Sequence, residues 1–141
     1  MRTIKFRAMR NNGKWVIGNY VHHFISYFDE IERHSIFLSK SENDNGGHWV
    51  EDIITKTIGQ FTGLYDKDGK EIYEGDILKW SKGRLYVVKF LDGMFYASVE
   101  ECNEGILGGF PLHRLTEYED GKCKIIGNIF DNPELMKGGL K

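Results

Sequence analysis

One unbroken segment, residues 60–79, constrains the fold more than any other part of the chain. It reads Gln-Phe-Thr-Gly-Leu-Tyr-Asp-Lys-Asp-Gly-Lys-Glu-Ile-Tyr-Glu-Gly-Asp-Ile-Leu-Lys. Asp66–Gly69 is typical of a tight turn in which glycine adopts a positive φ, and Glu74–Asp76 forms a second turn. Apolar residues follow at once, from Ile77 to Trp80, as they do where a strand begins. The segment therefore predicts short strands joined by tight turns.

The N-terminal part of the chain predicts a β-hairpin. Ile4, Phe6 and Ala8 alternate with basic residues, which is the period-2 pattern of a strand with one buried face. Asn11–Lys14 is a hairpin turn, so Trp15–Val21 should pair back antiparallel. Further short apolar runs lie at 35–39, 49–50 and 53–54. Residues 40–47 are polar and rich in glycine, which predicts a loop. Residues 27–34 are compatible with one helical turn.

From Thr57 onward, apolar runs and turn residues alternate at short spacing. Lys82-Gly83 and Asp92-Gly93 are two-residue turns, and Asp120-Gly121 is a third. We expect five strands here, at 76–80, 85–91, 94–99, 110–115 and 123–130, which form a meandering SH3-like small barrel. A short C-terminal helix should follow, with Asn132 as its cap and Pro133 in its first position.

The predicted fold is therefore mainly β: an N-terminal β-hairpin region, an SH3-like small barrel and a short C-terminal helix. A chain of 141 residues fits one domain or two small β modules. Its 40% hydrophobic and 13% aromatic content is enough to form a core. If there are two modules, we expect residues 1–59 to form the N-terminal β region with a variable loop, and residues 60–141 to form the barrel with its helix.

The charge distribution argues against a large nucleic-acid-binding face. The chain has 19 basic and 21 acidic residues, a net charge of −2, and its predicted barrel is mildly acidic. Basic residues without acidic neighbours occur only at the start, at Arg2, Lys5, Arg7, Arg10 and Lys14. These five residues are candidates for binding an anionic partner, and the simpler interpretation is a strand with solvated outward charges.

Trp80 is a further candidate for partner binding. Aromatic side chains on a small barrel can stack on bases or grip a peptide, although most of them should fill the interior. Trp80 stands at the end of a predicted strand, where a tryptophan side chain can be partly exposed.

The sequence predicts no metal site and no cofactor. None of the five histidines has the spacing that zinc sites commonly use. His22 and His23, as neighbours in a strand, should point to opposite faces and cannot chelate one ion together without a bulge, so a zinc site would need residues from distant parts of the chain. Asp66–Gly69 superficially resembles a calcium loop, but glycine is its fourth residue and Ile77 occupies its twelfth position, where an EF-hand has glutamate.

We also predict no enzymatic activity. Glu71, Glu74 and Asp76 could serve as acid and base, but no nucleophile or oxyanion hole is recognisable beside them. Phosphate-binding glycine loops and hydrolase elbows do not occur. Cys102 and Cys123 are expected to be free, inert thiols.

The expected location is the cytoplasm. The N-terminal residues become charged before any apolar signal region forms, and no apolar run approaches the ~20 residues needed to cross a bilayer. We therefore expect a soluble protein without a membrane partner.

Three segments together resemble the YopX family of phage and prophage proteins. They are Ile4–Ala8, the central Gln60–Ile77 and the terminal Ile126–Leu135. The resemblance implies a mostly β accessory protein of unknown biochemical role in a bacterial host cell, and it supplies no catalytic residues. Our leading hypothesis is a nonenzymatic protein-interaction or self-assembling module, active as a homo-oligomer or on a protein partner. The alternative is nucleic-acid binding by the basic N-terminal hairpin.

Overall fold

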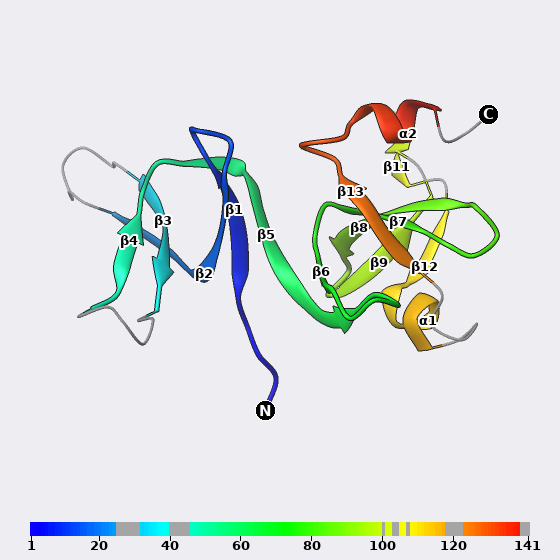
Figure 1. Cartoon of the computed structure of the whole chain (residues 1–141), viewed down its shortest axis with the longest axis horizontal. Coiled ribbons are helices and arrows are strands. Elements are labelled where there is room, and N and C mark those ends of the chain that lie inside the picture. Colours follow the sequence, from blue (N-terminus) through cyan, green and yellow to red (C-terminus); the bar gives the residue numbers. More distant parts are fainter. Residues whose placement is uncertain are drawn as a thin grey trace. The chain divides into compact units, whose positions relative to one another are not determined.

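The computed structural model describes residues 1–24, 32–39, 46–99, 101–102, 105–106, 108–117 and 123–138. The chain forms two compact units, Met1–Gln60 and Phe61–Lys141, which we call unit 1 and unit 2. Antiparallel strands dominate each unit (Figure 1). Only two short helices occur among the described residues, so the predicted mainly β class is confirmed.

Unit 1 is built from an antiparallel sheet with the strand order β4-β3-β2-β1-β5 (Figure 1). Its strands are β1 (Phe6–Arg10), β2 (Trp15–Phe24), β3 (Glu32–Leu38), β4 (His48–Val50) and the first part of β5 (Ile53–Tyr65). The predicted hairpin is present: Gly13 has φ 84°, and the Arg10 amide donates to the Lys14 carbonyl at 2.8 Å.

β3 begins earlier than the sequence indicated, because its first residues pair with the end of β2. The helical turn considered for 27–34 is wrong over its last three residues, where Glu32, Arg33 and His34 pair with Phe24, His23 and His22. These pairings give the backbone a ladder partner that a single helical turn would not supply. The rest of that prediction, residues 27–31, lies outside the described residues.

One face of this sheet carries the core of unit 1. Ala8, Ile36, Val50 and Ile53 are buried, and partly buried apolar side chains such as Phe6 and Tyr20 pack against them. A β-bulge interrupts the pairing of β1 with β5 between Arg7 and Met9. The buried Thr57 hydroxyl accepts the Met9 amide at 2.8 Å and donates to the Ile54 carbonyl, so a side chain replaces the interrupted ladder.

Unit 2 contains a five-stranded antiparallel sheet with the order β12-β9-β8-β7-β13, consistent with a small barrel-like module (Figure 1). Its strands are β7 (Asp76–Lys79), β8 (Leu85–Leu91), β9 (Met94–Ser98), β12 (Gly109–Pro111) and β13 (Lys124–Asn128). β6 (Glu71–Tyr73) pairs with the second part of β5, and β10 (Glu101–Cys102) pairs with β11 (Gly105–Ile106). The helices are α1 (Leu112–Glu117) and α2 (Glu134–Gly138).

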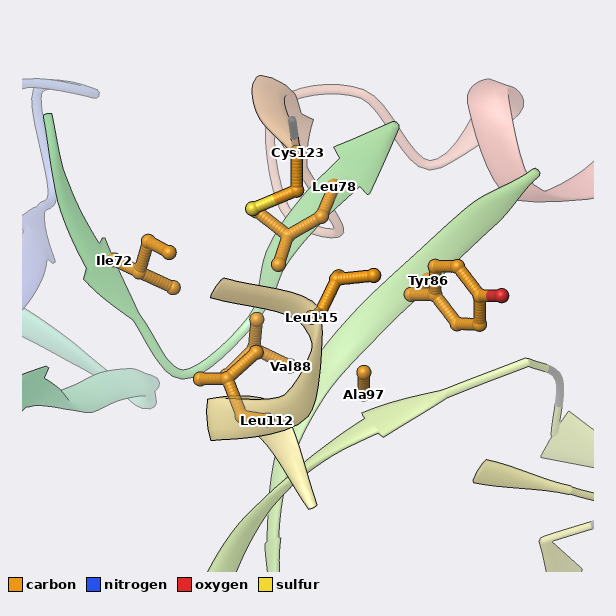
Figure 2. Packing of buried hydrophobic residues seen from close by; sticks show 8 residues of the cluster. All are labelled: Ile72, Leu78, Tyr86, Val88, Ala97, Leu112, Leu115 and Cys123. Carbon is orange, nitrogen blue, oxygen red and sulfur yellow. The ribbon is translucent and has the colours of Figure 1, made fainter. Parts of the chain in front are cut away.

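The core of unit 2 contains side chains from β6 to β9, from α1 and from the residue before β13. Figure 2 shows eight of them: Ile72, Leu78, Tyr86, Val88, Ala97, Leu112, Leu115 and Cys123. The predicted strand at 110–115 is wrong over most of its length, because Leu112 and Leu115 lie three positions apart on α1 and both face this core. That spacing places two side chains on one helical face.

The C-terminal helix is present, but Asn132 does not cap it as expected. Its side-chain oxygen accepts the Asn128 amide at 3.3 Å, while its backbone carbonyl accepts the Leu135 amide at 3.1 Å. Asn128 in turn accepts the amides of Phe130 and Asp131. The two asparagine side chains therefore hold the turn before α2.

Candidate functional site

The most recognisable segment of the sequence is explained by a buried carboxylate. Asp66 is only 6% exposed. Its Oδ1 accepts the Asp68 and Lys70 amides at 2.9 Å each, and its Oδ2 accepts the Ile125 amide at 3.1 Å. Burial opposes ionisation, but these three donors and the Lys70 charge hold the pKa of Asp66 below its ordinary value. Asp66 thus joins its own turn to β13.

Two neighbouring acidic residues are also hydrogen-bonded within the fold. The Asp76 carboxylate accepts the Tyr73 amide at 2.8 Å, and the Tyr73 hydroxyl donates to Glu71 at 3.0 Å. Between them, Gly75 has φ 87°, and an added Cβ would lie 3.1 Å from the Phe130 ring. Burial raises the pKa of the Cys123 thiol to about 11, with a further contribution from Asp66, so this cysteine is an unreactive core residue.

The basic residues at the N terminus do not converge on one surface. The Arg10 guanidinium forms three contacts of 3.1 Å with the Asp52 carboxylate. The Arg7 guanidinium instead lies 4.8 Å from the centroid of the Trp15 ring. Arg7 and Arg10 are separated by an odd number of positions along β1, so their side chains leave opposite faces of the sheet.

The other candidates from the sequence belong to both units. Arg2 and Lys14 are exposed, and Lys5 is half-buried. In unit 2 the half-buried Trp80 packs against the core, and the Lys82 ammonium lies 4.8 Å from its ring centroid. Five of the predicted residues therefore belong to unit 1, where Arg7 and Arg10 leave opposite faces of the sheet, and Trp80 belongs to unit 2.

A surface that the sequence did not single out lies on the second face of the unit 1 sheet. We call Ile17, Phe37 and Trp49 the outer face. Ile17 is 50% exposed and Trp49 is 55% exposed. Phe37 and Trp49 are direct cross-strand partners whose ring centroids lie 4.9 Å apart. Trp49 belongs to β4, which has a neighbour on one side only among the described strands.

The structure also brings together three polar side chains that the sequence left apart. His22 on β2 and His34 on β3 are direct cross-strand partners, and their rings stack at 4.7 Å with an interplanar angle of 3°. The Glu32 carboxylate lies 3.7 Å from His22 Nε2 and 3.8 Å from His34 Nε2. We call these three residues the histidine cluster. Assigning 32–34 to a strand and pairing it with β2 would have revealed it.

Tyr20 lies on the same face as the histidine cluster and contacts it directly. Its hydroxyl is 2.6 Å from His34 Nδ1, and its ring stacks on the His34 ring with centroids 5.9 Å apart. Burial, with a contribution from the Glu32 carboxylate, raises the pKa of the Tyr20 phenol. The phenol is therefore held neutral beside the imidazole.

Comparison with known proteins identifies the chain at the level of its family. It is similar to the solved structure described as the crystal structure of protein EF1440 from Enterococcus faecalis, with 23% identity and a TM-score of 0.59. The similarity covers 96% of this chain and 99% of that chain, which shows a shared fold. The curated proteins contain no match. No described helix is long and apolar enough to cross a membrane. The family model described as YopX protein matches residues 5–137, so the chain belongs to the YopX family.

Proposed function

We propose that this YopX-family protein is a nonenzymatic protein-interaction module that self-associates through the outer face and strand β4 of unit 1. The observation that carries the proposal is Trp49. It exposes 55% of its surface on the terminal strand of the unit 1 sheet and packs against the Phe37 ring. Exposed aromatic side chains beside an edge strand are typical of surfaces that bind another chain.

The preferred partner is a second copy of the same chain. An edge strand offers backbone donors and acceptors that an antiparallel strand can satisfy, and two copies of β4 can do this around a twofold axis. Trp49 stands on β4 itself, so pairing would also remove part of its apolar surface from water. Membership of the YopX family supports a further proposal, that the protein serves a phage or prophage in the cytoplasm of a bacterial host.

The test measures molar mass by light scattering or sedimentation over a wide concentration range. We expect a concentration-dependent dimer in the wild-type chain and a monomer in Trp49→Glu. Phe90→Glu is the matched control, because Phe90 is 50% exposed but belongs to unit 2. A wild-type chain that stays monomeric at every concentration would overturn the proposal, as would equal loss of the dimer in both variants.

The competing proposal, nucleic-acid binding by the N-terminal hairpin, is less well supported by the structure. Arg10 is paired with Asp52, and Arg7 and Arg10 leave opposite faces of β1. Fluorescence anisotropy of labelled single-stranded and duplex DNA, titrated with the protein, distinguishes nucleic-acid binding from self-association. Binding at low salt that falls steeply as salt is added would favour the hairpin. Its absence at low salt would remove this alternative.

A further inference from the structure

The histidine cluster has the register of a site built across two strands. His22 and His34 are opposite each other, and Glu32 lies two positions from His34, so all three side chains leave the same face of the sheet. Ile36, two positions further along β3, is fully buried on this face. The cluster therefore continues the core face of unit 1 towards the end of the β2–β3 hairpin, on strands and not on a free loop.

The spacing of the three side chains suits a small divalent cation better than it suits hydrogen bonding. One ligand atom from each residue lies within 4.8 Å of the other two. The distances of 3.7 and 3.8 Å from Glu32 to the two Nε2 atoms are too long for hydrogen bonds. Ligand atoms of tetrahedral zinc lie about 3.3–3.5 Å apart, because each is about 2.0–2.1 Å from the ion. To reach that geometry, the His22 and His34 rings, whose planes differ by only 3°, must turn out of their stack so that both Nε2 lone pairs point at the ion.

Tyr20 provides a second, independent observation. In the tautomer with Nδ1 protonated, the His34 ring donates to the Tyr20 oxygen at 2.6 Å and presents the Nε2 lone pair on the side of Glu32. Histidines that bind metals nearly always donate their other ring nitrogen to such an acceptor.

We propose that the histidine cluster binds one divalent transition-metal ion of the zinc type, through Nε2 of His22, Nε2 of His34 and the carboxylate of Glu32. Two imidazoles and one carboxylate favour zinc over magnesium or calcium, which prefer oxygen ligands alone. Three protein ligands leave a coordination position for water or for an atom from a partner. Tyr20 is a positioning residue, since it acts through His34.

The test is a calorimetric titration of zinc chloride into the full-length, metal-free chain without an affinity tag. The absorption spectrum of bound Co²⁺ is a second readout of metal binding. We expect one ion per chain. His22→Gln, His34→Gln and Glu32→Gln should each abolish binding or weaken it strongly. Tyr20→Phe should weaken it about 10- to 100-fold, as loss of a residue that orients a ligand usually does.

His113→Gln is the matched control, because His113 is an exposed histidine on α1 of unit 2. It should bind zinc as the wild type does. Circular dichroism of each metal-free variant separates lost ligands from lost folding, and Glu32→Gln keeps the test decisive because the Glu32 side chain is 55% exposed. Absence of zinc binding to the wild type would overturn the proposal, as would equal binding by the wild type and the three ligand variants.

Discussion

Two carboxylates, one in each unit, have opposite surroundings. Asp66 in unit 2 is almost fully buried, and backbone amides occupy both of its oxygens. Glu32 in unit 1 has a 55% exposed side chain and faces two imidazole nitrogens beyond hydrogen-bonding distance. Asp66 stabilises the fold, while Glu32 is a ligand in the metal site that we propose. A recognisable sequence motif can therefore mark a structural turn.

The largest effect should come from removing the structural carboxylate. Asp66→Ala leaves three amides without their acceptor and should lower the free energy of unfolding of unit 2 by about 3 kcal/mol. Urea denaturation followed by Trp80 fluorescence in a W15F/W49F background measures it, because the chain has three tryptophans and Trp80 is the one in unit 2. The exposed Asp68 is the control, and Asp68→Ala should change the stability by less than about 0.5 kcal/mol. Equal losses in the two variants would contradict the structural role of Asp66.

The next largest effect concerns Glu32 and the proposed zinc site in unit 1. If the histidine cluster binds zinc, free zinc at 100 times its dissociation constant should stabilise unit 1 by about 2.7 kcal/mol. Thermal unfolding followed by Trp15 and Trp49 in a W80F background measures the shift. Glu32→Gln should remove it, while Asp66→Ala should leave it unchanged. A zinc-induced shift that survives Glu32→Gln would show that zinc binds elsewhere.

Acid should remove the contribution that the ionised Asp66 makes to the stability of unit 2. The pKa of Asp66 is lower in the folded state than in the unfolded chain, so its ionisation stabilises unit 2 above the unfolded pKa of about 3.9. That contribution is lost as pH falls through the folded pKa, with a slope of at most about 1.4 kcal/mol per pH unit. Urea midpoints measured from neutral to acidic pH should show this loss in the wild type. In Asp66→Asn the loss of stability in acid should be smaller, by the amount that the ionisation of Asp66 contributes in the wild type.

The smallest expected effect is the change in stability when Glu32 is replaced in the metal-free chain. Glu32→Gln should change the stability of the metal-free chain by less than about 0.5 kcal/mol, because the side chain is largely exposed and its contacts with the histidines are long. The same urea titration, followed by Trp15 and Trp49, measures it. A loss comparable to that of Asp66→Ala would mean that Glu32 is structural too, and the contrast between the two carboxylates would fail.

The sequence predicted what depends on neighbouring residues. Gly13, Gly69 and Gly93 all have positive φ at turns that the sequence had marked, because this preference is local. The apolar run at 110–115 was ambiguous, since a short run fits a strand or a helix, and only the core that receives Leu112 and Leu115 decides between them.

The histidine cluster could not be predicted for a different reason. It depends on the pairing of His22 with His34, which lie 12 positions apart, and no two-residue turn in the intervening sequence fixes the register. Treating 27–34 as a helical turn also hid the alternation that places Glu32 and His34 on one face. The outer face was missed likewise, because Trp49 meets Phe37 only through the pairing of β3 with β4.

The Asp66 turn also has a consequence for hydrogen exchange. The amides of Asp68 and Lys70 lie in the turn and that of Ile125 lies 59 positions from Asp66, but all three share Asp66 as their acceptor. Their protons should therefore exchange with solvent in concert, with rates that follow a single opening event and not the local fraying of each segment. Three resonances in a spectrum of the intact chain would then report one event, the separation of this turn from β13.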